Sequence, residues 1–415
     1  MSDLSNVRIN GQRLWDSLME MGKIGGTPKG GCKRLTLTDV DKQGRELFRA
    51  WCQQAGLTLK IDEMGNMFAR RAGVEDSLPP VVLGSHLDTQ PTGGKFDGVL
   101  GVLGALEVVR SLNDLKIKTR HPIEVANWTN EEGSRFAPAM VSSGVFAGVF
   151  TKEFAYSRTD PEGKKLGDEL QRIGFKGEEP VGGWPVHAYF ELHIEQGPIL
   201  EAEGYEVGIV TGGQGQRWYE IRLTGFESHA GCTPMPLRKD ALLGAARIVE
   251  LVNKIGLSKA PLGVSTCGML NPYPNSRNVI PGSAFMTCEF RHPDDETLAD
   301  MDAQLRAGVE QIAKTAGLTY EMQQVFYYAP VPFDKGCIEA VRRAADHFGY
   351  SHRDIVAGAG HDACYMAGVT PTSMVFTPCV DGVSHNESEE IKLEWSTAGA
   401  NVLLHAALEK AEIVG

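Results

Sequence analysis

Two adjacent glutamates, Glu131 and Glu132, follow an apolar segment at 123–128 that is expected to be a strand. Neighbouring carboxylates repel each other, and burying either one alone is costly. A solvated turn is one explanation for the pair. The other is that a cation lies beside them, so that one carboxylate binds the cation while its neighbour moves protons. The residues at the ends of the other predicted strands bear on this choice.

Further candidate metal ligands stand at those strand ends. His86 and Asp88 follow an apolar run, Asp97 lies in the glycine-rich loop after them, His193 ends an alternating run, and His385 follows a fourth run. One histidine at a strand end is ordinary, but functional groups gather at the carboxyl ends of strands in open α/β sheets. Imidazoles and carboxylates together suit zinc, manganese, cobalt or nickel. A carboxylate shared by two ions would place them about 3.5–4 Å apart.

The elements that must position these residues alternate between strand and helix. This alternation holds up to residue 212 and resumes near 330, which predicts an α/β/α sandwich. Between 213 and 329 the predicted order is β-α-β-β-α-β, the order of ferredoxin-like domains. The first helix of that segment is expected at 236–256, with a proline at its start. We therefore expect a discontinuous catalytic domain, residues 1–212 and 330–415, and an inserted α+β domain, residues 213–329.

Composition restricts the class of protein further. The chain has 415 residues, 42% of them hydrophobic, and a net charge of −12 without a basic block, which argues against nucleic acid and anionic membranes as partners. No apolar run approaches the roughly 20 residues of a membrane span, and the N-terminal residues do not form a secretory signal. Eight scattered cysteines without such a signal predict reduced thiols and a cytoplasmic location.

Several stretches resemble the M20-type metallohydrolases, and they include GSHLDTQPTGGKFDG, NEEGSRF, ELHIEQG, ESHAG, AGAGHDA and DGVSHNESE. The resemblance is closest to the amidase, hydantoinase and carbamoylase branch, which includes N-carbamoyl-L-amino acid hydrolase, β-ureidopropionase and allantoate amidohydrolase. It implies hydrolysis of the ureido C–N bond of an N-carbamoyl amino acid, two divalent metal ions per subunit, and an inserted domain that acts as a lid and dimer interface.

The resemblance also implies a role for each candidate metal-site residue. Asp97 bridges the two ions, His86 and His193 hold one of them, Glu132 and His385 hold the other, Glu131 is the general acid–base, and Asp88 orients the ring of His86. The peptidase branch has a carboxylate where His193 stands, so this histidine favours the carbamoylase branch.

Substrate-binding roles are implied for residues elsewhere in the chain. His229 resembles the donor to the transition-state oxygen, in its own or a neighbouring subunit's site. Asn278 and Arg291 resemble a clamp for the substrate carboxylate, a role that suits the planar guanidinium of arginine. The pocket lining is expected to include Gln196, Gly360 and His361. A homodimer formed through the inserted domain is expected.

Three alternative functions share much of this pattern. An allantoate amidohydrolase or another ureidoglycolate-type enzyme would use the same ligands. An exopeptidase is disfavoured by His193. A catalytically inactive metal-binding scaffold is disfavoured by the presence of Glu131 beside a complete ligand set.

Overall fold

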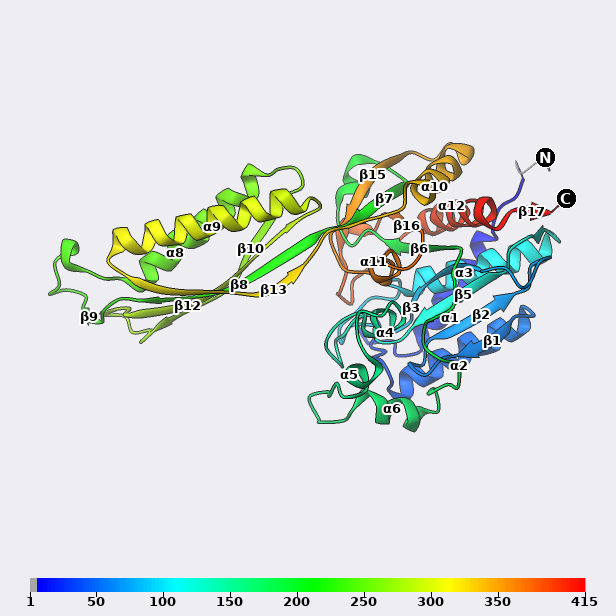
Figure 1. Cartoon of the computed structure of the whole chain (residues 1–415), viewed down its shortest axis with the longest axis horizontal. Helices are drawn as coiled ribbons and strands as arrows, with labels where there is room; N and C mark the ends of the chain where they lie inside the picture. The colour runs from blue at the N-terminus through cyan, green and yellow to red at the C-terminus, as the bar shows by residue number, and fades with distance from the viewer. Residues whose placement is uncertain (1–5, 415) are drawn as a thin grey trace. The chain divides into compact units, whose positions relative to one another are not determined.

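A computed structural model describes residues 6–414 (Figure 1). The chain divides into two compact units. The first runs to Gly212 and resumes at Phe333, and the second spans Gly213–Pro332. Within residues 6–414, no helix is long and apolar enough to cross a membrane.

A large mixed sheet forms the centre of the first unit. Its strands lie in the order β1-β2-β5-β3-β6-β16-β7, and β15 also pairs with β7. Strands β5, β3, β6 and β16 are parallel neighbours, so their carboxyl ends lie at one edge of the sheet. The bounds are β1 Thr58–Ile61, β2 Met67–Arg71, β3 Val81–His86, β5 Ile123–Trp128, β6 Ala188–Ile194, β7 Val207–Gly213, β15 His352–Ala357 and β16 Thr372–Thr377.

Helices cover both faces of this sheet. Leu192 of β6 contacts the helix α3 (Val99–Asp114) at Gly104 and the helix α12 (Leu393–Ala411) at Gly399. The preceding residue, Glu191, points to the other face, where it accepts a hydrogen bond from the backbone N–H of Ala363 in α11. Successive strand residues face opposite sides, so α3 and α12 lie on one side and α11 on the other. This arrangement is the predicted α/β/α sandwich.

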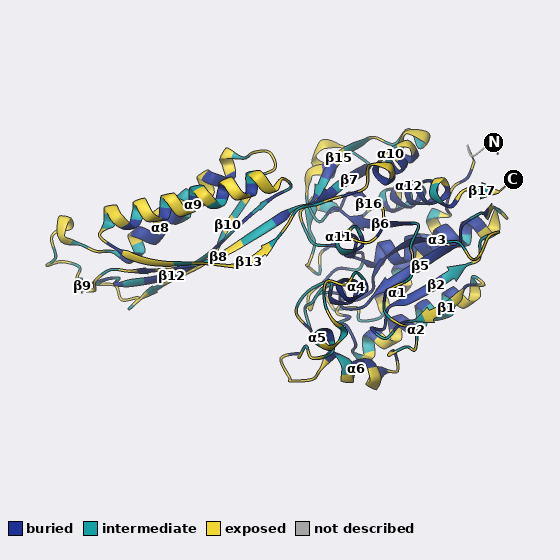
Figure 2. Ribbon diagram, viewed as in Figure 1, coloured by how far each residue is buried: buried dark blue, intermediate teal, exposed yellow. Residues whose placement is uncertain are grey.

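The remaining elements of the first unit complete these layers. Helices α3 and α12 are buried along almost their whole length, as the dark blue ribbon in Figure 2 shows, because they are apolar on nearly every side. The other helices are α1 Gly11–Lys23, α2 Asp39–Gln54, α4 Val141–Phe146, α5 Lys152–Tyr156, α6 Leu166–Ile173, α7 Ile199–Glu203, α10 Lys335–Phe348 and α11 Asp362–Met366. Short elements are β4 Lys118–Thr119, β17 Ile413–Val414 and the 3₁₀ turn η2 Val380–Gly382.

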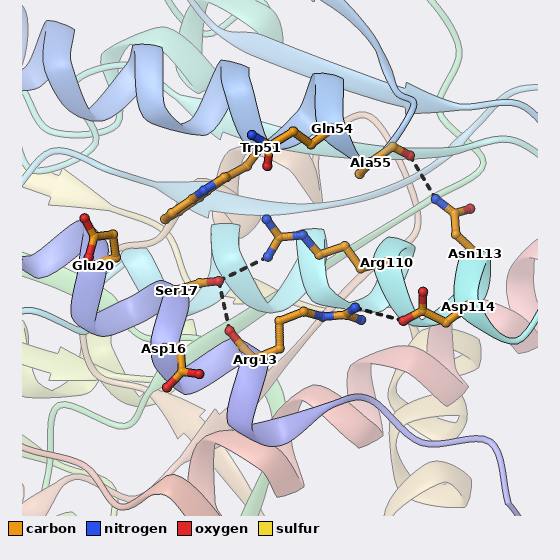
Figure 3. Close-up of a pocket in the computed structure, with 10 residues that line it drawn as sticks. All are labelled: Arg13, Asp16, Ser17, Glu20, Trp51, Gln54, Ala55, Arg110, Asn113 and Asp114. Carbon is orange, nitrogen blue, oxygen red and sulfur yellow. Dashed lines mark hydrogen bonds and ion pairs between the residues drawn. The ribbon is translucent and has the colours of Figure 1, made fainter.

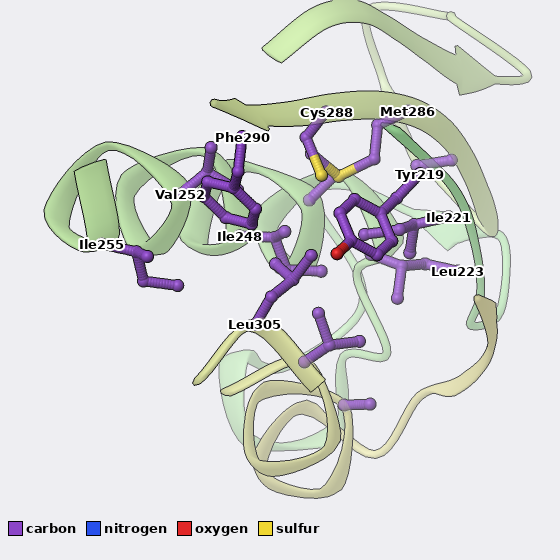
Figure 4. Packing of buried hydrophobic residues seen from close by; sticks show 14 of the residues in the cluster. Tyr219, Ile221, Leu223, Ile248, Val252, Ile255, Met286, Cys288, Phe290 and Leu305 are labelled. Carbon is purple, nitrogen blue, oxygen red and sulfur yellow. The ribbon is translucent and has the colours of Figure 1, made fainter. Parts of the chain in front are cut away.

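The second unit is a four-stranded antiparallel sheet with two helices packed on it. The strand order β10-β12-β8-β13, with the chain order β8-α8-β10-β12-α9-β13, is that of the ferredoxin-like fold. Its core lies between the sheet and the helices and includes Tyr219, Ile248, Phe290 and Leu305 (Figure 4). The bounds are β8 Gly215–Thr224, β9 Ser228–His229, η1 Met235–Leu237, α8 Ala241–Ser258, β10 Val264–Tyr273, β11 Val279–Ile280, β12 Ser283–His292, α9 Asp295–Ala316, β13 Thr319–Tyr328 and β14 Val331–Pro332.

The expected start of α8 is wrong. Pro236 lies in the separate turn η1, and the helix begins only after Asp240, whose side chain accepts a hydrogen bond from the backbone N–H of Leu243 at 3.0 Å. An aspartate at this position satisfies an otherwise unpaired donor, so the cap and not the proline sets the helix start. Strand β15 was also not expected, because HRDIVA lacks a clear alternating pattern.

Candidate metal site

The candidate ligands meet at the carboxyl edge of the large sheet. Oδ1 of Asp97 lies 3.1 Å from Nε2 of His193 and 3.5 Å from Nε2 of His86. Oδ2 of Asp97 lies 3.4 Å from Nε2 of His385, and this nitrogen lies 3.4 Å from Oε2 of Glu132. The side chains therefore form two groups, each with three ligand atoms close enough to share an ion. Asp97 belongs to both groups.

Hydrogen bonds at the far side of two rings fix which nitrogen faces Asp97. Nδ1 of His86 lies 2.9 Å from the carbonyl oxygen of Asp88, and Nδ1 of His193 lies 2.9 Å from that of Ile194. A carbonyl only accepts, so each Nδ1 carries a proton, and in the neutral ring each Nε2 presents a lone pair. The backbone N–H of Gly98 donates to Nε2 of His193 at 3.1 Å, which agrees with this assignment.

The site favours positive charge between these atoms. Burial lowers the pKa of His193, but the charge and hydrogen bond of Asp97 together with the charge of Glu191 raise it overall. Burial raises the pKa of Glu132 to about 7, and the charge of Asp97 adds to the rise. Lone pairs of imidazole and carboxylate that converge on one space are the donor set of a divalent transition metal. The residues present therefore fit the implied metal ions.

Glu131 occupies a different place from its neighbour. Its Oε2 lies 3.4 Å from Nε2 of His86, and its side chain is buried. Burial raises the pKa of Glu131 well above its usual value, and nearby carboxylates, including Asp362, add to the rise although His86 opposes it. A raised pKa of this kind suits a carboxyl group that accepts a proton and gives it up again.

The loop that carries the two glutamates is fixed by Asp88. Oδ1 of Asp88 lies 3.9 Å from Nδ1 of His86, and the backbone carbonyl of Asp88 lies closer to that nitrogen, at 2.9 Å. That the Asp88 carboxylate orients the ring of His86 stays a prediction. The carboxylate accepts hydrogen bonds from the backbone N–H groups of Glu131 and Glu132, both at 3.3 Å. Asp88 thus connects β3 to the loop after β5.

Sequence reasoning missed several residues that hold the ligands. Glu389 accepts hydrogen bonds from the backbone N–H groups of Phe96 and Asp97, at 2.9 and 3.0 Å, and Ser384 donates to Oδ2 of Asp97 at 2.8 Å. Gln90 donates to Oε2 of Glu132 at 2.6 Å. Ser384 and Glu389 lie in the same stretch, DGVSHNESE, as His385. The resemblance of that stretch to the M20-type metallohydrolases could therefore have pointed to all three residues.

The residues expected to line the pocket have distinct positions. Gln196 donates from Nε2 to Oδ2 of Asp97 at 2.7 Å and so contacts the candidate bridging ligand. The buried ring of His361 packs edge-on against the ring of His193, with centroids 4.4 Å apart. Neither ring nitrogen of His361 has a hydrogen-bond partner among the described residues. Gly360 precedes this histidine and is half-buried.

Three predicted substrate-binding residues belong to the second unit. The exposed His229 accepts hydrogen bonds at Nδ1 from the backbone N–H groups of Gly231 and Cys232, at 3.0 and 3.2 Å. Two donors at Nδ1 place the ring proton on Nε2, where it is available to an incoming oxygen. Asn278 lies beside His229, because its carbonyl accepts a hydrogen bond from the backbone N–H of Ala230 at 3.0 Å.

Arg291 lies at the opposite end of the same sheet. Strand β12 pairs Ser283 with Thr224 near the His229 end and Arg291 with Gln216 at the other end. Eight residues separate Ser283 from Arg291, which is roughly 26 Å at about 3.3 Å per residue. Asn278 and Arg291 of the same chain therefore lie too far apart for one small substrate to contact both. Their role as a clamp for the substrate carboxylate stays a prediction.

The fold and the site are those of a metal-dependent hydrolase with an inserted α+β domain. Residues 82–409 match the model of peptidase family M20/M25/M40, and the chain belongs to this family. An N-carbamoyl-L-amino-acid amidohydrolase of Rhizobium meliloti is 56% identical, over 99% of this chain and 98% of that protein. A ureidoglycolate hydrolase of Arabidopsis thaliana is 31% identical, over 96% of this chain and 86% of that protein.

A solved structure agrees with the fold over the same extent. The crystal structure of an amidase of the hydantoinase/carbamoylase family from Burkholderia multivorans superposes with a TM-score of 0.96. It is 65% identical and covers 98% of each chain. The resemblance inferred from the sequence motifs is therefore confirmed at the level of the family.

Proposed function

We propose that this chain hydrolyses the ureido C–N bond of N-carbamoyl-L-amino acids and releases the amino acid, carbon dioxide and ammonia. The reaction type rests on one observation, the buried carboxyl group of Glu131 beside the ligand groups that share Asp97. The substrate class is supported by the name of the relative from Rhizobium meliloti, which matches nearly the whole chain.

His86 and His193 are proposed to hold one metal ion, and Glu132 and His385 a second, with Asp97 shared between them. Zinc, manganese, cobalt and nickel all suit this donor set. Ions bound here would supply Lewis acidity, lowering the pKa of bound water and polarising the carbamoyl oxygen. The protein's own contribution at this point is to hold six ligand atoms from five side chains close together before any ion arrives.

Glu131 is proposed to move the proton. It accepts a proton from the attacking water as the water oxygen bonds to the carbamoyl carbon, and it gives that proton to the nitrogen that leaves when the C–N bond breaks. The carbamate formed then decomposes to carbon dioxide and ammonia. Burial and neighbouring carboxylates raise the pKa of Glu131, so its protonated form is accessible when the leaving nitrogen needs it.

His229 is proposed to donate from Nε2 to the oxygen that gains negative charge, and Arg291 to bind the substrate carboxylate through two parallel hydrogen bonds. Because these residues lie at opposite ends of the sheet in the second unit, one chain cannot bring both to one substrate. We therefore propose a homodimer, formed through the second unit, in which His229 and Asn278 serve the neighbouring subunit's site.

A cytoplasmic location is part of the same proposal.

Mixing two inactive variants tests this dimer. Co-expressed Glu131→Gln and His229→Ala chains should form mixed dimers in which one site has both Glu131 and a partner His229, so turnover should reappear. Each variant alone should be nearly inactive. If His229 acted within its own chain, every site in the mixture would lack one group and no turnover would return.

A substrate panel tests the proposed specificity. Ammonia release should be fastest with N-carbamoyl-L-amino acids and slower with N-carbamoyl-β-alanine, allantoate and ureidoglycolate. The Arabidopsis relative makes ureidoglycolate the second candidate substrate. Faster cleavage of a dipeptide than of any carbamoyl compound would instead establish an exopeptidase, and metal binding without any turnover would establish an inactive scaffold.

A further inference from the structure

A cavity of about 580 Å³ lies between α1, α2 and α3 (Figure 3). Arg13, Asp16 and Ser17 of α1, Trp51 of α2, and Arg110 and Asp114 of α3 line it. Arg110 is eleven residues along α3 from Val99, or about 17 Å at a rise of about 1.5 Å per residue. The cavity is therefore at the other end of α3 from Asp97 and is no part of the candidate metal site.

Arg110 is unusual among the cations of this region. Its Nη1 donates to the hydroxyl of Ser17 at 3.1 Å, and its guanidinium lies 5.5 Å from the ring centroid of Trp51. Within residues 6–414, no carboxylate forms an ion pair with it. A guanidinium has five N–H donors, so Arg110, which lines the cavity, has donors beyond the one that binds Ser17. Burial lowers the pKa of Arg110, while the charges of Glu107 and Asp114 oppose that shift.

The nearby carboxylates are already engaged by other partners. Glu107 accepts hydrogen bonds from Nε and Nη2 of Arg13, both at 2.8 Å, and from the hydroxyl of Ser111 and the backbone N–H of Asn10. Asp114 pairs with Nη1 of Arg13 at 2.8 Å. The charge of Arg13 is thus neutralised twice, whereas that of Arg110 is not. Arg110 is half-buried and forms no ion pair within residues 6–414, so a bound anion would give its charge a direct partner.

The rim of the cavity narrows the choice of anion. Asp16, Glu20 and Asp114 are among the residues that line the cavity, so a multiply charged anion such as phosphate would be repelled. The exposed Asp16 accepts a hydrogen bond at 2.8 Å from the neutral amide of Gln12, and no cation pairs with it in the described part of the chain. A ligand with one carboxylate and one ammonium group meets both requirements. The half-buried indole of Trp51 provides an apolar wall for a side chain.

We propose that this cavity binds a free α-amino acid, with its carboxylate on Arg110, its ammonium group toward Asp16 and its side chain against Trp51. The site is separate from the proposed reaction, and its existence does not depend on which substrate the enzyme hydrolyses.

Fluorine NMR of the metal-loaded full-length protein carrying 5-fluorotryptophan tests this inference. The chain has six tryptophans, and a Trp51→Phe variant assigns the resonance of Trp51. L-leucine at millimolar concentration should shift this resonance in a saturable way. The matched molecule without the amine, 4-methylpentanoate, should bind more weakly, and the one without the carboxylate, isopentylamine, should leave the resonance unchanged.

The Arg110→Gln variant and inorganic phosphate test whether the cavity binds an amino acid through Arg110. Arg110→Gln should weaken leucine binding about tenfold or more, since a charge-assisted hydrogen bond is lost, while turnover stays unchanged. An unmoved Trp51 resonance, or an equal shift in Arg110→Gln, would overturn the proposal. An equal shift by inorganic phosphate would overturn the amino-acid assignment. If Arg110→Gln does not fold, the comparison of leucine, 4-methylpentanoate and isopentylamine on the unaltered protein still decides.

Discussion

Nε2 of His193 lies 3.1 Å from Oδ1 of Asp97, and in the neutral ring both atoms are acceptors. Two lone pairs at this distance repel unless a positive charge lies between them. The rest of the fold holds both side chains in place, with Ile194 behind the ring and Glu389 behind the backbone of Asp97. The arrangement is therefore organised for a cation that two acceptors share.

Replacing Glu131 by glutamine should stop turnover without loss of metal. The amide keeps the size of the side chain but cannot accept the proton, so kcat should fall by about 10²–10⁴-fold, the usual contribution of a positioned acid–base group. Steady-state ammonia release and metal analysis of the same sample measure both properties. Glu390→Gln, at an exposed glutamate, is the matched control and should retain the rate. Near-normal turnover in Glu131→Gln would remove the proposed role.

Replacing Arg45 by methionine should destabilise the first unit. Arg45 and Asp41 form a fully buried ion pair at 2.8 Å, and Arg45 also donates to the carbonyl of Gly65 and the hydroxyl of Thr129. Its loss leaves the Asp41 charge buried without a partner, which costs about 3–5 kcal/mol in the free energy of unfolding. Denaturant titration measures this. Arg343→Met, which breaks an exposed pair with Glu409, should cost less than about 1 kcal/mol.

The pH dependence of stability should change when Arg135 is replaced by glutamine. Burial opposes ionisation of Asp160, yet the backbone N–H of Lys164 and the guanidinium of Arg135 lower its pKa. Burial likewise opposes ionisation of Glu169, and Arg172 and Arg135 lower its pKa. A lowered pKa in the folded state gives stability above the unfolded value, about 3.9 for Asp and 4.3 for Glu, and that stability is lost as the pH falls through the folded value.

The difference in unfolding free energy between the unaltered protein and Arg135→Gln should therefore be largest near neutral pH and should shrink as the pH falls below about 4. Denaturant titrations at several pH values measure it. Two parallel stability curves would contradict this explanation and would show that Arg135 acts by packing alone.

The ends of strands were the part of the molecule most open to prediction. Four of the ligands follow apolar runs whose parallel pairing brings the strand ends together: His86, Glu132, His193 and His385. The alternating pattern of residues 188–194 also predicted that Leu192 and His193 point to opposite faces of their strand. The contacts of Asp88 were not predictable, because backbone N–H groups and a ring nitrogen compete for one carboxylate and only the folded loop decides between them. The separation of Asn278 from Arg291 required the register of β12, which no local pattern specifies.

Metal content measures the central claim most directly. Protein stripped by a chelator and reloaded separately with zinc, manganese, cobalt or nickel should retain two ions per subunit with at least one of them, by elemental mass spectrometry. His385→Ala should retain one ion, Asp97→Asn should retain neither tightly, and the surface variant His352→Ala should retain two. Retention of two ions by Asp97→Asn, or of none by the unaltered protein, would contradict the proposal that Asp97 joins two metal sites.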